Sequence, residues 1–134
     1  MMEPESEYSR LRRVLACRLG SFRYAFAGLA YVLRSQLNAR IHAAVTILVV
    51  VASLWLGLSR SEWALLVVTI AIVWTTEILN TAIEAVVDLV SPEMHPLAKI
   101  AKDCAAAAVL VTAIMAVAVG LLLLGPKLWD RLGF

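Results

Sequence analysis

The sequence lacks the short motifs by which many nucleotide and metal enzymes are recognised. It has no GxxxxGK[ST] loop and no glycine-rich kinase loop, so any ATP site in it would be of an unrelated design. It has no Glu-x-x-His pair, which argues against a carboxylate-bridged metal oxidase. The first forty residues contain no long apolar run, so we expect no cleavable signal peptide. Only two cysteines occur, Cys17 and Cys104, and we expect both to be small apolar thiols rather than redox or metal groups.

Charged residues are also scarce, and apolar residues dominate. The apolar types make up 62% of the 134 residues, against roughly 45–50% in soluble domains, and the mean hydropathy is +0.86. A spanning helix needs about 20 mostly apolar residues. The sequence therefore predicts one membrane domain over residues 1–134, with spans at 38–58, 63–90 and 97–124. The first span reaches this length only if the polar side chains at its start extend to the interface.

Basic residues are distributed unevenly between the expected loops. Seven of the twelve Lys and Arg residues lie before the first span or at its start, and Lys99 and Lys102 lie between the second and third. Only Arg60, Lys127 and Arg131 fall on the other side. The positive-inside rule therefore places the N-terminus and the second loop in the cytoplasm. The net charge of +2 is too small to suggest nucleic acid as a partner, and the basic N-terminal segment is expected to meet anionic lipid.

An amphipathic segment, 10–35, precedes the first span. Its apolar residues at i, i+4, i+7 and i+11 are Phe22, Phe26, Leu29 and Leu33. These four share one face of a helix, which would lie along the inner membrane surface. Such a helix serves either as an anchor alone or in substrate capture. We expect a break at Gly20-Ser21, with Ser21 as the N-cap of the second part.

The loops are short and contain helix caps and helix breakers. Ser59 or Ser61 can cap the second span, with Glu62 near the positive end of that helix. Gly125-Pro126 is expected to end the third span.

A stripe of small residues runs along the third span: Ala101, Ala105, Ala108, Thr112, Ala116 and Gly120. Such a stripe lets another helix approach closely. We expect an oligomer, although packing within one bundle would use the same stripe.

The stretch EILNTAIEAVVD places polar residues inside the second span. Glu77, Asn80, Thr81, Glu84 and Asp88 have the spacing of one helical face, and Glu77 and Glu84 are about 10 Å apart along the axis. An acidic residue at the centre of a membrane helix costs on the order of 2.5–3.5 kcal/mol and usually marks function. Packing explains Asn80 and Thr81 as well as function does. The two glutamates need a proton, a metal ion or a basic group from a loop to neutralise them.

The second loop and the start of the third span offer such groups. A lysine at a helix N-terminus is unfavourable next to the positive end of the helix dipole unless an anion binds there. We therefore expect Lys102, beside Asp103, to bind phosphate. Lys99 can simply extend to the interface. Mg²⁺ takes one or two protein carboxylates and completes its coordination with water and phosphates. Phosphoryl transfer also needs a base near the attacking hydroxyl. A base at Glu77 could serve only a hydroxyl at membrane depth, which is that of a lipid alcohol.

EILNTAIEAVVD, followed by HPLAKIAKD and AAAAVL, resembles the signature of the prokaryotic diacylglycerol kinase family, which are small trimeric membrane lipid kinases. The resemblance covers residues 22–124, and FRYAFAGL, Arg40-Ile41-His42 and LSRSEW resemble the undecaprenol kinase branch more closely. It implies an all-α integral membrane protein of the prokaryotic cytoplasmic membrane, with three transmembrane helices and an N-terminal amphipathic surface helix. It also implies a homotrimer with shared active sites, which phosphorylates diacylglycerol or undecaprenol from ATP with Mg²⁺.

The resemblance also implies a role for each site residue. Glu77 matches the general base, Asn80 a residue that orients the site, and Glu84 a carboxylate that holds the metal on ATP. The residues that match nucleotide contacts are Glu93, Met94, His95, Lys102 and Asp103. The chain departs from the family at Gln36, where a second metal-binding glutamate is expected. An amide oxygen can bind Mg²⁺ but adds no negative charge. We therefore expect that Mg²⁺ binds more weakly, that a second metal ion is absent, or that another residue replaces the missing glutamate as a ligand.

Two other interpretations compete with a lipid kinase. A proton or cation pathway would use Glu77, Glu84 and Asp88 as relay steps, but the outer half of that span has no ionisable residue to continue it. The second interpretation is a non-catalytic assembly partner, and it is favoured by Gln36 at the position where a metal-binding glutamate is expected. The sequence does not decide between diacylglycerol and undecaprenol as the acceptor.

Overall fold

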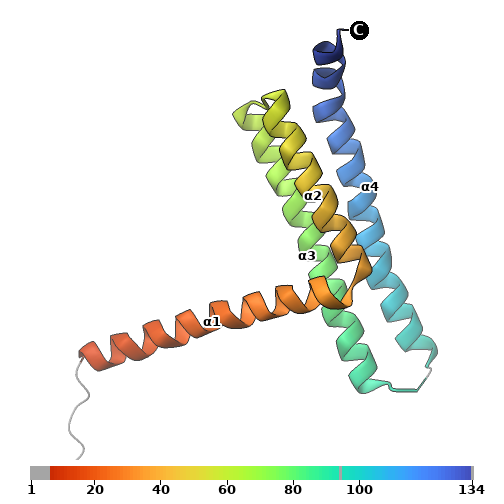
Figure 1. Cartoon of the computed structure of the whole chain (residues 1–134). Coiled ribbons are helices and arrows are strands. Elements are labelled where there is room, and N and C mark those ends of the chain that lie inside the picture. The colour runs from red at the N-terminus through yellow and green to blue at the C-terminus, as the bar shows by residue number, and fades with distance from the viewer. Residues whose placement is uncertain (1–6, 94, 134) are drawn as a thin grey trace, which may run out of the picture. The chain divides into compact units, whose positions relative to one another are not determined.

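The structure is a computed structural model that describes residues 7–93 and 95–133, with side-chain surroundings described from residue 20 onward. The described residues form four α-helices (Figure 1): α1 (Glu7–Ser35), α2 (Leu37–Leu56), α3 (Arg60–Val90) and α4 (Pro96–Leu132). Contacts within the chain divide it into two units, residues 1–35 and residues 36–134. The all-helical fold with three long apolar helices and an N-terminal helix is therefore confirmed.

The first unit consists of α1, a single continuous helix. The predicted break at Gly20-Ser21 is wrong, because α1 runs through both residues. One glycine inside a helix costs about 1 kcal/mol relative to alanine, which is too little to end a helix of this length. Phe22 and Phe26 are 65% and 69% exposed, and their insertion into lipid stays a prediction.

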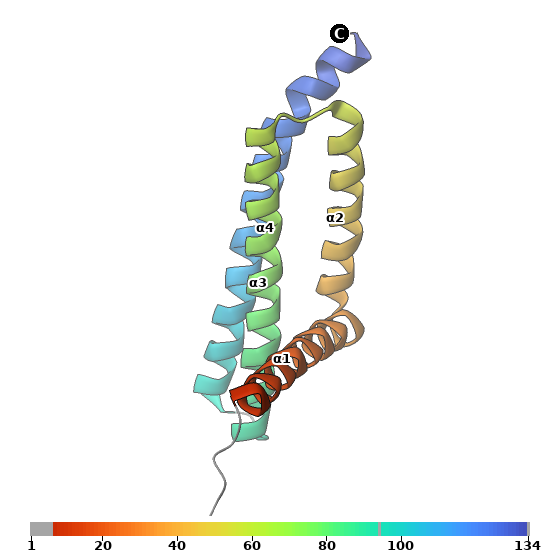
Figure 2. The same ribbon diagram turned by 90° about the vertical axis from the view of Figure 1, so that its left-hand side faces the viewer.

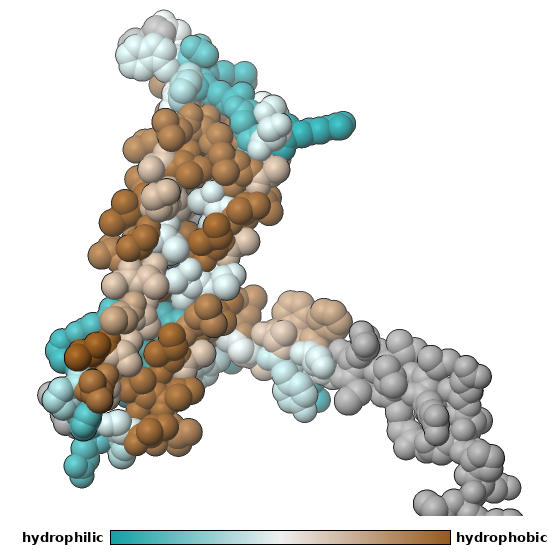
Figure 3. Space-filling view, turned by 180° about the vertical axis from the view of Figure 1, so that it is seen from behind, coloured by the Kyte–Doolittle hydropathy of each residue, from teal (hydrophilic) through white to brown (hydrophobic). Residues whose placement is uncertain are grey.

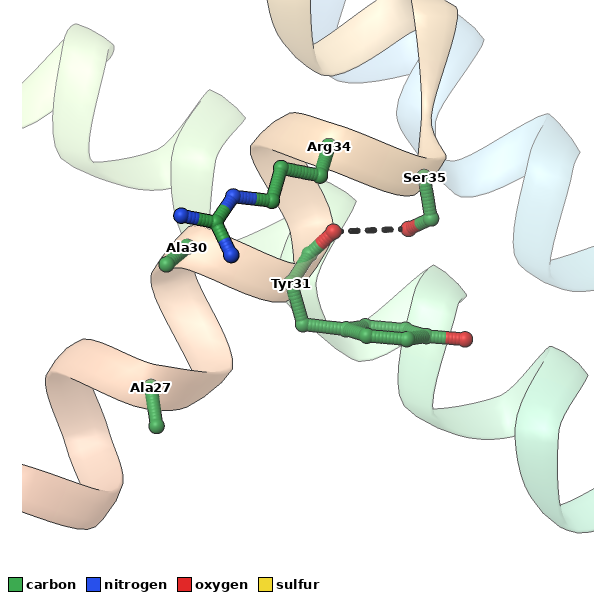
Figure 4. Close-up of a pocket in the computed structure, with 5 residues that line it drawn as sticks. All are labelled: Ala27, Ala30, Tyr31, Arg34 and Ser35. Atoms are coloured by element: carbon green, nitrogen blue, oxygen red, sulfur yellow. Dashed lines mark hydrogen bonds between the residues drawn. The ribbon is translucent and has the colours of Figure 1, made fainter.

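The surface of the last turns of α1 has a shallow, open depression of about 440 Å³ lined by Ala27, Ala30, Tyr31, Arg34 and Ser35. Figure 4 shows these five side chains, with Ser35 Oγ donating to the Tyr31 carbonyl at 2.8 Å. The small alanines leave space there. Tyr and Arg both carry an apolar stem and a polar tip, so this end of α1 suits the interface between lipid and water.

The second unit is an antiparallel arrangement of α2, α3 and α4. All three helices are long and apolar enough to cross a membrane. In Figure 3 this unit has apolar side chains through its middle and hydrophilic ones toward its ends. Since a bilayer core about 30 Å thick matches helices of about 20 residues or more, three crossings account for the apolar surface that the unit exposes.

The α2–α3 turn is built as the sequence predicts. Gly57 ends α2 with φ of 68°, a left-handed conformation that glycine adopts without strain. Ser59 then caps α3: its N–H donates to Glu62 Oε2 at 2.6 Å and its Oγ accepts from the Glu62 N–H at 3.4 Å. This reciprocal pair is a capping box, so the predicted serine cap with Glu62 in the first turn is confirmed.

Replacing Ser59 by alanine is expected to lower the free energy of unfolding by about 1 kcal/mol, because one N–H of the first turn loses its acceptor. Ser61→Ala is the matched control, since the structure gives Ser61 no side-chain bond among the described residues. Reversible unfolding in detergent micelles measures both variants. Equal losses in the two would contradict the role assigned to Ser59.

The C-terminal part of α4 departs from prediction. The expected helix end at Gly125-Pro126 is wrong, because Pro126 lies inside α4. Proline removes one backbone donor and disturbs the preceding turn, but two contacts hold the residues beyond it. Lys127 Nζ lies 3.3 Å from Glu62 Oε2, and the Arg131 guanidinium lies 5.3 Å from the centre of the Trp55 ring. These two pairs, the C-terminal contacts, join the end of α4 to the ends of α2 and α3.

Candidate functional site

The polar residues of EILNTAIEAVVD lie along α3 and become more exposed toward its C-terminal end. Glu77, Asn80 and Thr81 are buried, with exposures of 1%, 6% and 5%. Glu84 is half-buried and Asp88 is exposed. The hydroxyl of Thr81 donates to the backbone carbonyl of Glu77 at 3.0 Å, so this hydroxyl has its hydrogen-bond acceptor within its own helix. The face therefore runs from a closed interior at Glu77 to an accessible end at Asp88.

Glu84 is held by two amide side chains. Gln36 Nε2 donates to Glu84 Oε2 at 2.9 Å, and Asn80 Nδ2 donates to Glu84 Oε1 at 3.1 Å. Gln36 is the N-cap residue of α2, but its side chain makes no cap bond. Its amide instead joins the start of α2 to α3. Because each carboxylate oxygen has its own donor, the orientation of Glu84 is fixed by residues 4 and 48 positions away in sequence.

Glu77 has a different environment. Both of its carboxylate oxygens are buried without a hydrogen-bond partner among the described residues. From α2, His42 and the backbone of Ala39, in the first turn of that helix, both act on the Glu77 carboxylate. A buried carboxylate without a partner is costly, and an unsatisfied group in a native site often marks a place where a proton, an ion or a substrate group belongs. Glu77 is closed to solvent, with 1% of its surface exposed.

The connection between α3 and α4 contains both helix caps and charge pairs. His95 is the N-cap of α4, and its Nδ1 accepts from the Leu97 N–H at 3.2 Å. Ser91 Oγ donates to the Glu93 carbonyl at 3.0 Å, and Glu93 is exposed. Met94 lies outside the described residues. The cap function of His95 was not predicted, although a residue just before a proline at the helix start is a usual cap position.

The two lysines of α4 both pair with acids. Lys102 Nζ lies 2.7 Å from Asp88 Oδ1, and Lys99 pairs with Asp103 one turn along the same helix. The side chains of Lys102 and Asp88 are 39% and 64% exposed, and exposed pairs of this kind are weak, at about 0.2–1 kcal/mol. An anion can therefore compete for Lys102 at modest cost. Sequence reasoning missed the Asp88–Lys102 pair, which joins the two sides of a helical hairpin.

The group around Glu84 fits a magnesium ion. The Glu84 carboxylate and the amide oxygens of Asn80 and Gln36 are hard oxygen donors, the type that Mg²⁺ prefers, and Asn80 Oδ1 is buried without a partner among the described residues. No three His, Cys, Asp or Glu side chains converge in the part of the chain that the structure describes. A bound Mg²⁺ would therefore take most of its ligands from water and phosphate. Gln36 would have to turn its amide over to present oxygen.

Comparison with known proteins places the sequence in a family. The family profile described as prokaryotic diacylglycerol kinase matches residues 23–124. A Synechocystis protein named diacylglycerol kinase is 51% identical over 111 residues, which is 82% of this chain and 63% of the relative. The undecaprenol kinase of Bacillus subtilis is 42% identical over 81% of this chain and 88% of its own length. The diacylglycerol kinase of Escherichia coli is 36% identical over 82% of this chain and 87% of its own length. The chain thus matches just under two thirds of the Synechocystis protein and most of the other two.

Proposed function

Because the chain belongs to the prokaryotic diacylglycerol kinase family, we propose that it is a multi-pass membrane lipid kinase that transfers the γ-phosphate of ATP to the hydroxyl of a lipid alcohol. The observation that supports this most directly is the buried, unpartnered carboxylate of Glu77 in a membrane span. A base in that position can take a proton only from a group that enters the membrane, which matches a lipid hydroxyl and excludes water-soluble acceptors.

In the proposed reaction, Glu77 accepts the proton of the lipid hydroxyl while the hydroxyl oxygen attacks the γ-phosphorus and the bond to the β-phosphate oxygen breaks. General-base catalysis of this kind contributes roughly 10²–10⁴-fold. Glu84, oriented by Gln36 and Asn80, would hold the Mg²⁺ that accompanies ATP. The ion, when bound, neutralises negative charge on the phosphoryl group.

The nucleotide phosphates are proposed to meet the start of α4. Lys102 can exchange Asp88 for a phosphate oxygen, and the positive end of the α4 dipole favours an anion as well. Glu93, His95 and Asp103 border the same region, and Met94 adjoins them in sequence. The pairing of Lys102 with Asp88 keeps the lysine in place on the face that carries Glu84.

Replacing Lys102 by methionine is expected to raise the KM for ATP about tenfold or more, since a charge-assisted hydrogen bond contributes about 1.5–3 kcal/mol. The KM for the lipid should change little. Lys99→Met is the matched control, because Lys99 is 73% exposed and pairs along its own helix, and it should keep an ATP KM within twofold of the parent. Steady-state kinetics with each substrate varied in turn separates the two effects. Equal ATP KM values for both variants would contradict the assignment.

We also propose that the protein is a homotrimer in the cytoplasmic membrane of a prokaryote, with its N-terminus in the cytoplasm. The excess of Lys and Arg before α2 supports this orientation. Exposed small residues such as Ala108 on α4 support close packing between subunits. Chemical cross-linking in vesicles, followed by mass measurement, tests the trimer. The trimer would be contradicted if the largest cross-linked species were a dimer, or if cross-linking gave a continuous series of larger oligomers.

The direct test of the proposed function is an assay of two acceptors side by side. The full-length protein in phospholipid vesicles receives γ-labelled ATP and Mg²⁺ with either undecaprenol or diacylglycerol. The relatives carry both names, and we expect label in the lipid phosphate of at least one of them. No labelled lipid from either acceptor, with the protein folded, would overturn the proposal.

A further inference from the structure

Two side-chain hydrogen bonds fix how α2 lies against α3. The two helices run in opposite directions (Figure 2). Gln36 Nε2 donates to Glu84 Oε2 at 2.9 Å, and Trp74 Nε1 donates to Thr46 Oγ1 at 3.3 Å. From the first bond to the second, the position on α2 advances by ten residues and the position on α3 goes back by ten. Because both helices rise about 1.5 Å per residue, the two bonds belong to one antiparallel register.

This register places His42 beside the proposed base. Glu77 lies seven residues before Glu84, so it is level with Ala43 of α2. His42 adjoins Ala43, and both are half-buried, whereas the residues directly before and after this pair are exposed. His42 also acts electrostatically on the Glu77 carboxylate, as the register requires. The histidine is therefore on the side of α2 that meets the other spans, at the depth of Glu77.

The two side chains differ in their access to solvent. Glu77 is 1% exposed, and neither of its carboxylate oxygens has a hydrogen-bond partner among the described residues. A proton accepted by this carboxylate has no direct path to water. His42 is half-buried and follows the exposed Arg40 by two residues, about 7.5 Å along the axis from the first residue of α2. It therefore lies between the closed base and the polar start of that helix.

The chemistry of imidazole suits a group in this place. A general base must lose the proton that it has taken before it can act in the next turnover. A neutral imidazole has one nitrogen that can accept a proton, and histidine both gains and loses a proton between about pH 5 and 8. It can thus take a proton from a carboxylic acid and pass it to water near neutral pH.

We propose that His42 is a relay residue that acts through Glu77 and returns this base to its ionised form after each phosphate transfer. The proposal rests on the proposed kinase function and deepens its base step. The O–H bond of the lipid hydroxyl breaks, and its proton binds a Glu77 oxygen. The same proton then moves to the free nitrogen of His42, which leaves Glu77 as a carboxylate. The imidazolium finally gives the proton to water at the start of α2.

The other ionisable groups that face this pair do not offer the same path. Glu84, two turns along α3, has both oxygens occupied by the amides of Gln36 and Asn80. Arg40 on α2 keeps its proton at any pH at which the protein is folded. On α4, residues 105–126 contain no ionisable side chain. His42 is therefore the group next to Glu77 that can both accept and release a proton.

The test compares the first turnover with later ones in His42→Gln. The full-length protein in vesicles receives labelled ATP, Mg²⁺ and a lipid alcohol that the parent phosphorylates. Glutamine forms hydrogen bonds but cannot carry the proton away. We expect a first turnover within threefold of the parent and a steady-state rate at least tenfold lower, so that a burst of one lipid phosphate per site precedes slow turnover. Equal losses in both phases, or no loss in either, would overturn the proposal.

Asn38→Gln is the matched control for this experiment. It introduces the same side chain at an exposed position four residues earlier on α2, and both phases should stay within twofold of the parent. A burst in this control as large as that of His42→Gln would also overturn the proposal, because it would show a general effect of changes at the start of α2.

Nitrogen NMR of protein labelled with ¹⁵N-histidine gives a readout that does not need catalysis. The chain has two histidines, His42 and His95. The imidazole signals of His42 should titrate differently in Glu77→Gln than in the parent, whereas those of His95 should be the same in both. His42 signals that do not respond to Glu77→Gln would overturn the proposal. A response of His42 in a protein that phosphorylates no lipid alcohol would support the pairing of the two side chains and overturn the kinase function.

Discussion

Replacing Glu77 by glutamine is expected to lower the rate of phosphate transfer to lipid by roughly 10²–10⁴-fold, the usual contribution of a general base. Glutamine has nearly the same volume and shape but cannot take a proton from the attacking hydroxyl. The stability of the protein should not fall, because the buried carboxylate has no hydrogen-bond partner to lose among the described residues. Loss of activity with unchanged stability would separate a chemical role from a structural one.

The matched control for this experiment is Thr76→Val, one residue before Glu77. The Thr76 hydroxyl donates to the Ile72 carbonyl of its own helix and lies outside the polar face. This variant should keep its transfer rate within twofold of the parent. Single-turnover transfer from labelled ATP, together with unfolding in micelles, measures both quantities. A Glu77→Gln protein that keeps more than half of the parent rate would remove Glu77 as the base.

The second large effect is expected for Glu84→Gln. Glu84 is the only acid in the cluster with Gln36 and Asn80, and Mg²⁺ depends on charge as well as on oxygen ligands. We expect the Mg²⁺ concentration for half-maximal transfer to rise at least tenfold, with a smaller change in the rate at saturating Mg²⁺. A titration of transfer rate against Mg²⁺ at fixed ATP measures this. An unchanged titration would contradict the proposed metal role.

Gln36→Glu is the complementary variant. It places a second carboxylate at the position where an amide N–H now donates to Glu84 at 2.9 Å, so two like charges face each other when no cation is present. We expect this variant to be less stable than the parent without Mg²⁺ and to recover when Mg²⁺ is added. Its half-maximal Mg²⁺ for transfer should be lower than that of the parent. Thermal unfolding with and without Mg²⁺ gives a readout that does not depend on activity. Stability insensitive to Mg²⁺ would show that Gln36 does not adjoin a metal site.

The features that follow local sequence rules could be predicted. The three long apolar helices follow from composition and length, and the Ser59–Glu62 cap follows from residue types at fixed spacing. The shared face of Glu77, Asn80 and Glu84 follows from the period of the helix. Each of these depends on residues within one or two turns of each other, where propensity and periodicity are strong guides.

The features that were missed depend on partners distant in sequence. α4 continues through Pro126 because Glu62 and Trp55, on other helices, contact residues beyond it. Lys102 pairs with Asp88 across a hairpin, and Gln36 reaches Glu84 over 48 positions.

The most direct test of the account is to identify where the γ-phosphate of ATP goes. The full-length protein in vesicles with ATP, Mg²⁺ and either undecaprenol or diacylglycerol should yield ADP and the phosphate of at least one of these lipids in equal amounts, with that lipid gaining the mass of one phosphate group. Glu77→Gln under the same conditions should yield neither above background. ADP and inorganic phosphate without lipid phosphate from any lipid alcohol, or Glu77-dependent proton flux across the vesicle membrane without ATP consumption, would contradict the account.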